Sequence, residues 1–433
     1  MTVRARDLSI AFALLSLLIA LFPVLTMQGG LPAQSLFSAS AALVMAAAGV
    51  AARAADVQFA AQVTRRLGPM AAIPAVWMII QLLPLPVPAL SHTIWINANE
   101  ALDQKAWGHI SVDLGKTIEA LTFYLANIAL VLSSILVARD HQRAGRLFIL
   151  LGAITILTVL TLLADHAFHF FDIASGYPQQ GLGAASALGL VLSLAIGAFG
   201  VERHGAPAKR SGRIFLFSGA AGVLICATGL AAAANANLAI VAVFGAATFL
   251  SIQLARALRL ATWTIAILLA TIVAGAAMIV AWRFDTHRTL SPLLQFATAT
   301  PASSFAVAQR LLADTGWLGA GAGTYTVLLP IYQDFADAVT RLPSTASVLV
   351  VELGLPMVLV IVGIGLWLVV RLYSGALRRG RDSFYAAAAA SGAVILLGGA
   401  FCDASLLQAG IAATGDVLIG VGMAQSVSRV DIA

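Results

Sequence analysis

The residues with the clearest chemical potential are arginines in one polar stretch of an otherwise apolar chain. A guanidinium group forms paired hydrogen bonds with phosphate oxygens, so these side chains could hold a phosphate or a pyrophosphate. They could equally form scattered salt bridges with aspartates in the same stretch, and Arg283 could simply mark the end of a membrane helix. The stretch is residues 283–345, and its arginines are Arg283, Arg288, Arg310 and Arg341.

A glycine-rich run follows Arg310 in the same stretch. Residues Gly316, Gly319, Gly321 and Gly323 precede Tyr325. Glycine adopts backbone conformations that other residues avoid, and successive glycines can turn several N–H groups toward one anion. The same spacing is typical of a tight re-entrant turn at a membrane surface. Glycine spacing alone favours the turn, because short glycine motifs are weakly specific.

Other polar residues suggest less specific chemistry. Glu352 lies six residues into the apolar run that begins at Ala346. A carboxylate at such a place needs a partner, so it either hydrogen-bonds within a helix bundle or anchors the preceding loop. His166 and His169 have metal-compatible spacing, but with two nearby aspartates they form no defined ligand set. We therefore expect no metal and no cofactor.

The composition indicates a membrane protein. The 433 residues are 60% hydrophobic and 10% charged, whereas soluble domains carry about 25% charged residues. The net charge of +6 does not indicate nucleic-acid binding, because the basic residues fall in short gaps between apolar runs. Cys226 and Cys402 provide no disulfide framework and are expected in the core.

Apolar runs predict an all-α, polytopic fold in a single membrane domain, residues 1–433. About 20 apolar residues are needed to cross the hydrocarbon layer, and only helices satisfy their backbone within such a run. We expect about 12 transmembrane helices, the first of them retained rather than cleaved as a signal peptide. The predicted spans are 8–27, 36–52, 69–87, 117–138, 147–164, 182–200, 214–232, 236–255, 261–282, 346–370, 384–402 and 408–425.

The distribution of basic residues predicts the orientation. With the N-terminus in the cytoplasm, 19 of the 25 Lys and Arg residues lie on the inner side and 6 on the outer side, as membrane proteins prefer. Both termini are then cytoplasmic. Residues 283–345 become a large periplasmic loop between helices 9 and 10, within which Ser303–Leu312 has the apolar spacing of a helix.

Several segments together resemble a known family. The run from Arg310 through Gly319-Ala-Gly-Ala-Gly-Thr-Tyr325, then Pro330-Ile-Tyr332, then Pro343 to Glu352-Leu-Gly354, is similar to the O-antigen ligase and polymerase-like family. That family carries alternating glycines before an aromatic residue, followed by an E-x-G sequence that opens a span. The segments Gln81–Pro88 and Phe401–Leu407 are also similar to its members.

The resemblance implies a GT-C-like architecture and a metal-independent, inverting glycosyltransferase. Such enzymes take a glycan from undecaprenyl diphosphate at the periplasmic face of the bacterial inner membrane and attach it to lipid A-core or a growing polysaccharide. Outer arginines would stabilise the departing diphosphate. The implied catalytic residues are His287, Arg288 and Arg310. The implied substrate-binding residues are Arg341, Gly319, Gly321, Gly323, Tyr325, Tyr332, Ser344, Thr345 and Glu352.

The chain also departs from the family pattern. Members carry a histidine about nine residues before the glutamate, where this chain has Pro343, followed by Ser344 and Thr345. A Ser-Arg-Gly-like outer turn is replaced by Ala234–Asn237. His287 or His109 could substitute for the histidine. The departures leave open a catalytically degenerate accessory binder of the same fold. A secondary transporter is a third alternative, but the inverted repeats it requires are not visible.

Overall fold

The computed structural model describes ten parts of the chain. They are residues 4–85, 91–103, 107–168, 177–204, 210–233, 235–258, 293–297, 302–333, 342–379 and 382–426. Regular structure in these parts consists of α-helices, one 3-10 helix at Ser405–Leu407 and one isolated bridge between Leu85 and Gly108. The predicted all-α class is confirmed.

Eight helices in the described parts are long and apolar enough to cross a membrane. At a rise of 1.5 Å per residue, about 20 residues cover the hydrocarbon layer. The protein is therefore a polytopic membrane protein. The eight are α3 (Leu31–Ala51), α7 (Leu114–Val137), α8 (His141–Phe168), α9 (Tyr177–His204), α10 (Arg210–Ala232), α11 (Ala236–Ala257), α16 (Leu355–Arg378) and α17 (Ser383–Cys402).

Two predicted continuous spans are wrong in detail, because the structure divides each of them. The run 8–27 is interrupted at Leu21, and a new helix begins at Phe22 with Pro23 in its first turn, where proline is favoured. Its parts are α1 (Arg4–Ala20) and α2 (Phe22–Met27). The run 346–370 is divided at Gly354 into α15 (Thr345–Leu353) and α16. The predicted span 261–282 lies outside the described residues.

The remaining helices are shorter or more deeply buried. Helix α5 (Leu67–Leu82) ends before Pro84 and is shorter than its predicted span, and α18 (Ala409–Ser426) is buried along nearly its whole length. One helix was missed by the sequence prediction, α4 (Ala54–Thr64), which lies in a segment predicted as a polar connection. The others are α6 (Thr93–Leu102), α13 (Ala302–Asp314) and α14 (Tyr325–Tyr332).

The centre of the bundle is formed by α9, α17 and α18. Small side chains let these helices approach closely, as is common in membrane bundles. A Cβ atom on Gly422 of α18 would lie 2.1 Å from the Cβ of Ala389 on α17. Next to this contact, Phe148 stacks edge-on against Phe384 and Tyr385, with ring centroids 5.9 and 5.2 Å away. Because lipid tails are as apolar as these side chains, close packing rather than the hydrophobic effect holds the helices together.

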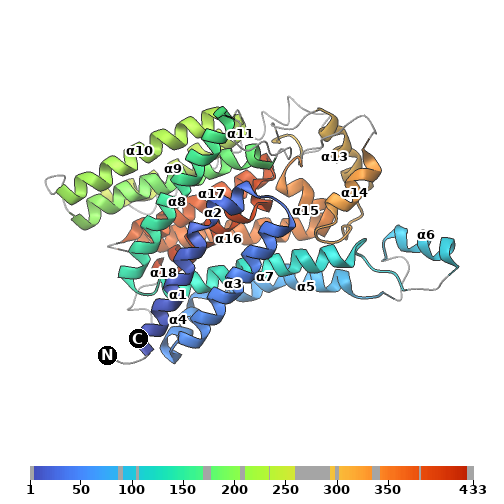
Figure 1. The fold of residues 1–433 in the computed structure, drawn as a ribbon, viewed down its shortest axis with the longest axis horizontal. Helices are drawn as coiled ribbons and strands as arrows, with labels where there is room; N and C mark the ends of the chain where they lie inside the picture. Colours follow the sequence, from blue (N-terminus) through green and yellow to red (C-terminus); the bar gives the residue numbers. More distant parts are fainter. Residues whose placement is uncertain are drawn as a thin grey trace.

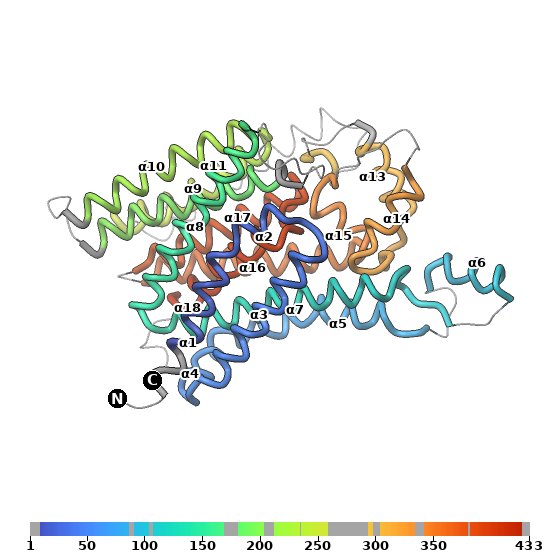
Figure 2. Tube along the Cα trace, in the orientation of Figure 1, coloured from blue at the N-terminus to red at the C-terminus, as the bar shows by residue number. Residues whose placement is uncertain are grey.

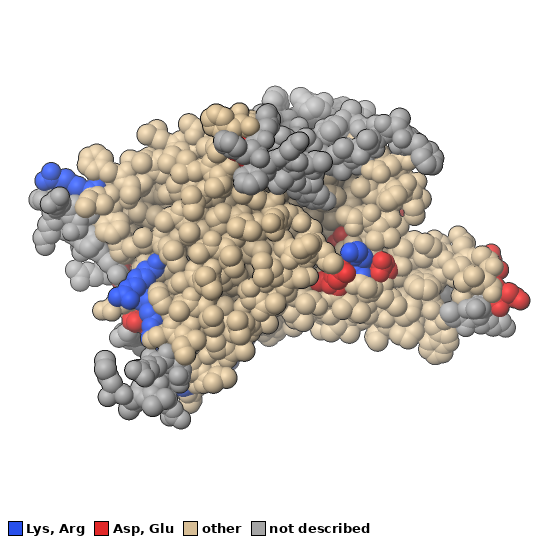
Figure 3. Space-filling model, viewed as in Figure 1, with Lys and Arg blue, Asp and Glu red and all other residues tan. Residues whose placement is uncertain are grey.

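The outer faces of the bundle expose large apolar side chains. Leu43 on α3, Leu224 on α10 and Leu359 on α16 are 57%, 69% and 62% exposed. Charged atoms are sparse on the face drawn in Figure 3. An extended apolar surface of this kind is unfavourable in water but favourable in contact with lipid tails.

The two ends of the bundle are built from different elements (Figures 1 and 2). We call one the basic end, where α1 begins and α18 ends; there Arg256 pairs with Glu202 at 2.8 Å and Arg139 pairs with Asp56. The opposite end carries a cap, defined as α13, α14, α15 and the glycine-rich loop 316–324. It also carries an arm, the end of α5 and the start of α7 with α6, which projects beyond the bundle.

Candidate functional site

The cap has a small hydrophobic core of its own. Val307 and Leu311 of α13 pack with Tyr325 and Leu328 of α14 and with Val351 of α15. The helical spacing predicted for Ser303–Leu312 is confirmed by α13. Because this core joins α13 and α14 to α15, it fixes the ends of the glycine-rich loop between them.

The glycine-rich loop adopts backbone conformations that require glycine. The φ angles of Gly319, Gly321 and Gly323 are +77°, +107° and +76°, a region that side chains with a Cβ rarely enter. Contact with neighbours adds a second requirement. A Cβ on Gly319 would lie 2.4 Å from the carbonyl oxygen of Glu352, and one on Gly321 would lie 2.4 Å from the hydroxyl of Ser111. The loop is therefore packed tightly against α15 and the start of α7.

The N–H groups of the loop are donated to acceptors within the protein. The amide of Ala320 donates to Val351 O at 2.8 Å, that of Gly321 to Glu352 O at 3.0 Å, and that of Ala322 to Oε1 of Gln81 at 3.1 Å. A phosphate would need such amides to be open. The substrate-binding role of the glycines stays a prediction, but the described geometry favours the re-entrant turn.

Glu352 anchors this loop. Its Oε1 accepts a hydrogen bond from the amide of Tyr325 at 3.2 Å, and its carboxylate also accepts from the amide of Gly323. The residue is 8% exposed and belongs to α15, outside the candidate spans. Burial raises its pKa to about 7, against the lowering effect of the two amide bonds. Of the two roles left open by the sequence, loop anchoring is the one found.

Gln81 was not identified from the sequence as a site residue, yet it joins three segments. It lies near the end of α5 and is fully buried. Its Nε2 donates to the carbonyl oxygens of Glu352 at 3.0 Å and Leu318 at 3.3 Å, while its Oε1 accepts from Ala322. An amide side chain in an apolar helix must find such partners. Gln81 could have been identified from the sequence as a single glutamine within the apolar run 69–87.

Ser344 and Thr345 are buried and point into the protein. Ser344 caps α15 by accepting a hydrogen bond from the amide of Ser347 at 3.2 Å. The amide and hydroxyl of Thr345 donate to the carbonyl oxygen of Asp403 at 2.8 and 3.0 Å. Burial raises the pKa of Asp403 to about 7, although its Oδ1 accepts from the hydroxyl of Ser405 at 2.5 Å. The role of Ser344 and Thr345 in substrate binding stays a prediction.

Arg310 and Tyr332 are brought together on the outside of the cap. Arg310 is exposed on α13, and its Nη1 lies 3.5 Å from the carbonyl oxygen of Tyr332 on α14. Partial burial and a hydrogen bond with Asp314 raise the pKa of the Tyr332 hydroxyl. His287, Arg288 and Arg341 lie outside the described residues.

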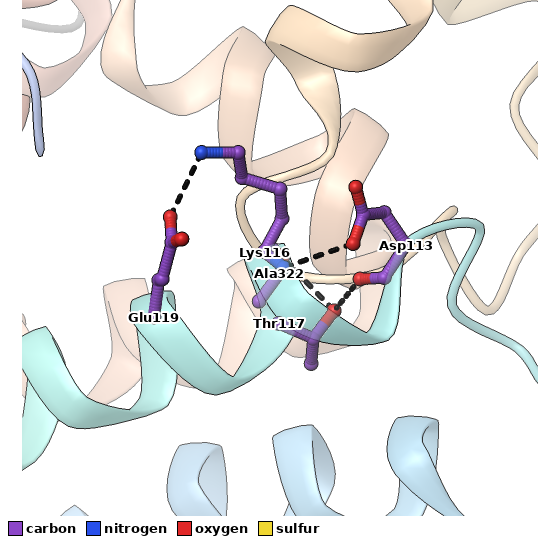
Figure 4. A network of polar contacts seen from close by, with 5 residues as sticks. All are labelled: Asp113, Lys116, Thr117, Glu119 and Ala322. Carbon is purple, nitrogen blue, oxygen red and sulfur yellow. Dashed lines mark hydrogen bonds and ion pairs between the residues drawn. The ribbon is translucent and has the colours of Figure 1, made fainter.

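A charged recess lies beside the glycine-rich loop. We define it by Asp113, Lys116 and Glu119 at the start of α7 (Figure 4). Oδ1 of Asp113 accepts from the amide of Lys116 at 3.1 Å, and Nζ of Lys116 lies 2.8 Å from Glu119 Oε2. Thr117 joins the recess to the loop by donating to Ala322 O at 3.0 Å. Figure 3 shows a basic patch flanked by acidic atoms in the hollow between the arm and the rest of the molecule.

The sequence analysis did not identify the recess, because its charges look like helix-start residues. Asp113 does cap α7, so the interpretation as helix-start residues is correct for Asp113. Only the fold places Lys116 and Glu119 beside a loop that lies about 200 residues further along the chain, which is evident from the Thr117–Ala322 contact. Their side chains are 37% and 40% exposed, so both can reach a ligand.

His109, a possible substitute for the family histidine, and the two asparagines of the replaced outer turn make structural contacts here. His109 stacks on Trp95 with ring centroids 5.2 Å apart, and its Nδ1 lies 3.0 Å from Leu82 O. Asn235 caps α11, and Nδ2 of Asn237 donates to Phe296 O at 2.5 Å. These side chains hold connections between helices of the bundle.

The cap and the recess together present two exposed cations beside a rigid, glycine-rich joint. In the described residues of both, the side chains with a fixed positive charge are Lys116 and Arg310. No protein-family model matches the chain, and no curated protein matches it significantly.

Proposed function

We propose that the chain is an O-antigen ligase-like membrane glycosyltransferase. It transfers a glycan from an undecaprenyl-diphosphate carrier to lipid A-core or to a growing polysaccharide. In this proposal the protein crosses the bacterial inner membrane about 12 times, the basic end faces the cytoplasm, and the cap faces the periplasm. The proposal rests on the motif resemblance and on the position of the exposed cations.

The observation that carries the proposal is the joint at Gly354. The lipid-exposed helix α16 begins directly after Gly354, with Leu355 and Leu359 41% and 62% exposed. The glycine-rich loop is attached at the same place through Glu352. Lys116 borders the same loop, since a Cβ on Gly323 would lie 2.7 Å from the Lys116 carbonyl oxygen. A cation beside a loop that adjoins an apolar face suits a substrate with a lipid tail and a diphosphate head.

The chemistry is an inverting displacement. A hydroxyl oxygen of the acceptor attacks the anomeric carbon of the glycan, and the bond from that carbon to the diphosphate oxygen breaks. Undecaprenyl diphosphate leaves with the bonding electrons, and the hydroxyl proton passes to a base, for which His287 is the proposed residue. Arg288, Arg310, Arg341 and Lys116 stabilise the charge that develops on the diphosphate.

Glu352 acts in this scheme as a positioning residue. Its carboxylate is buried and bonded to loop amides, so it does not face a substrate. By fixing the glycine-rich loop between α13 and α14, it holds Arg310 of α13 and Tyr332 of α14 at one side of the cap. Rigid support of this kind is what keeps charged groups aimed at a reacting centre.

A non-catalytic binder of lipid-linked glycan is the second candidate. It is favoured by one observation, that the described loop amides are already donated within the protein. The amides of Ala320, Gly321 and Ala322 are then not free to donate to a transition state. Incubation of purified protein with lipid-linked donor and acceptor distinguishes the two, since only the enzyme releases undecaprenyl diphosphate.

The decisive cellular experiment substitutes Arg310. Arg310→Ala should abolish surface polysaccharide on a gel while the protein level in the membrane stays unchanged, and Arg310→Lys should restore part of it. Arg146→Ala, which removes an exposed arginine from the start of α8, is the matched control and should leave the polysaccharide normal. Normal polysaccharide in Arg310→Ala would remove Arg310 from the site.

A further inference from the structure

Helix α4 forms an elbow between two membrane helices at the basic end. It connects α3 to α5, which starts at Leu67, and arginines flank it on both sides. With 11 residues it spans about 16 Å, too little to cross a bilayer. The segment 53–66, called the elbow from here on, carries Arg53, Asp56, Arg65 and Arg66 as its charged residues.

One face of the elbow is fixed to the bundle. Phe59 and Val63 are buried at 7% and 2% exposure. Asp56 pairs with Arg139 at the end of α7 and also accepts a hydrogen bond from the amide of Arg53 at 3.0 Å. The guanidinium of Arg139 lies over the Phe59 ring, 5.5 Å from its centroid. These contacts hold α4 in a defined position and neutralise its only acidic side chain.

The opposite face of the elbow is left strongly basic. Arg53, Arg65 and Arg66 are exposed, and the ion pairs found among the described residues include none of them. Since Arg139 balances Asp56, three positive charges stay uncompensated along one short helix. The exposed surface between them carries Val57, 54% exposed, and small or amide side chains.

The elbow lies at the depth where lipid head groups are expected. Val50, in the last turn of α3, is 88% exposed, which places lipid one turn before Arg53. The apolar helix α5 begins directly after Arg66. A short helix with a buried apolar face and basic ends, at the end of two apolar helices, has the features of an interfacial segment.

We propose that the elbow binds the phosphate groups of anionic phospholipids through Arg53, Arg65 and Arg66. A guanidinium forms paired hydrogen bonds with a phosphate, and each arginine near an anionic surface contributes about fivefold in affinity. The site is separate from the cap and holds whether or not the chain transfers glycans. It anchors the connection between α3 and α5, and through the Asp56–Arg139 pair it also holds the C-terminal end of α7, which Arg139 follows by two residues.

The test uses the full chain in nanodiscs made of zwitterionic lipid alone or with added phosphatidylglycerol. Phosphatidylglycerol should raise the Tm of the wild type. The triple variant Arg53→Gln, Arg65→Gln, Arg66→Gln should lose most of that rise while keeping the wild-type Tm in zwitterionic discs. The triple arginine-to-lysine variant should retain part of the rise, which separates charge loss from misfolding.

A matched control removes equal charge elsewhere. The triple variant Arg146→Gln, Arg213→Gln, Arg378→Gln replaces three other exposed arginines and should retain the response to phosphatidylglycerol. If both glutamine variants lose it equally, or if neither does, the elbow is not a lipid site. Inorganic phosphate added to the wild type in detergent should leave the Tm unchanged; an equal rise would assign the arginines to a soluble anion and overturn the lipid proposal.

Discussion

The Oε1 atom of Glu352 lies 3.2 Å from the amide nitrogen of Tyr325, and both residues are buried. Successive backbone amides in a glycine-rich turn can bind an anion, and in this protein the bound anion is a carboxylate of the same chain. The contact joins α14 to α15 across 27 residues of sequence. It makes the glycine-rich loop a structural joint on which the exposed groups of the cap depend.

Replacement of this carboxylate should change how stability depends on pH. The pKa of Glu352 is raised to about 7 by burial, from 4.5, so the folded state binds more protons than the unfolded state between these values. Stability contributed by this group is greatest at low pH and falls as the pH rises toward 7. The excess Tm of the wild type over Glu352→Gln should therefore shrink between pH 5 and pH 7.5, as measured by thermal unfolding in detergent.

A variant that weakens the same loop without touching the carboxylate serves as the control. Gln81→Leu should lower the Tm, and its difference from the wild type should stay constant over this pH range. Asp403 titrates in all three proteins and cancels in the comparison. A constant difference for Glu352→Gln as well would show that Glu352 does not change its protonation there.

Gly354 should tolerate no side chain. Its φ is +83°, and a Cβ would lie 2.1 Å from the carbonyl oxygen of Trp317. Gly354→Ala should cost about 2–4 kcal/mol, because both backbone strain and a clash with backbone atoms must be relieved. The readout is the thermal unfolding midpoint, together with protease cleavage in the loop 316–324.

Gly363, in the helix α16 that follows Gly354, provides the control substitution. A Cβ at Gly363 of α16 meets no atom within 4 Å, so Gly363→Ala should be neutral or slightly stabilising, as alanine favours helices. Equal Tm values for the two variants would mean that the joint at Gly354 is looser than the geometry indicates.

The sequence predicted most of the membrane helices because hydropathy is a local property. Runs such as 117–138 and 384–402 closely match α7 and α17. The division at Gly354 was missed, since apolar residues continue on both sides and the break depends on contact with Trp317. Helix α4 was missed because its burial needs Arg139 and the end of α7, more than 70 residues away.

The candidate site was less accessible to sequence reasoning. The alternating glycines and Glu352 were identified, and the structure joins them. What they bind was not predictable, because the acceptors for the loop amides come from α5 and α15. Lys116 and Glu119 have ordinary identities for a helix start, and only tertiary packing places them at the recess.

Gln81→Leu should lower the free energy of unfolding, because the buried Gln81 side chain holds several hydrogen bonds that leucine cannot form. Leucine has a similar volume, but it removes the hydrogen bonds that Gln81 makes with the Ala322 amide and the Leu318 carbonyl oxygen, whereas the Glu352 carbonyl oxygen keeps its bond from the Gly321 amide. An unsatisfied buried polar group costs about 1–3 kcal/mol. We expect a loss of about 2–4 kcal/mol in unfolding free energy, against little change for Gln142→Leu at the exposed start of α8. A loss below about 0.5 kcal/mol for Gln81→Leu would indicate that water replaces these bonds.

The recess offers a way to separate stability from ligand binding. Lys116 and Glu119 form an exposed pair, which contributes roughly 0–1 kcal/mol to stability. Lys116→Gln and Glu119→Gln should therefore both unfold near the wild-type Tm. If Lys116 binds the diphosphate, Glu119 competes with the ligand for the same ammonium group. Lys116→Gln should then weaken binding of a lipid-linked diphosphate donor about tenfold or more, as a lost charged hydrogen bond does, whereas Glu119→Gln should leave affinity unchanged or raise it. Equal losses in both variants would indicate that the pair only shapes the start of α7, and Arg310 would remain as the described cation in the proposed site.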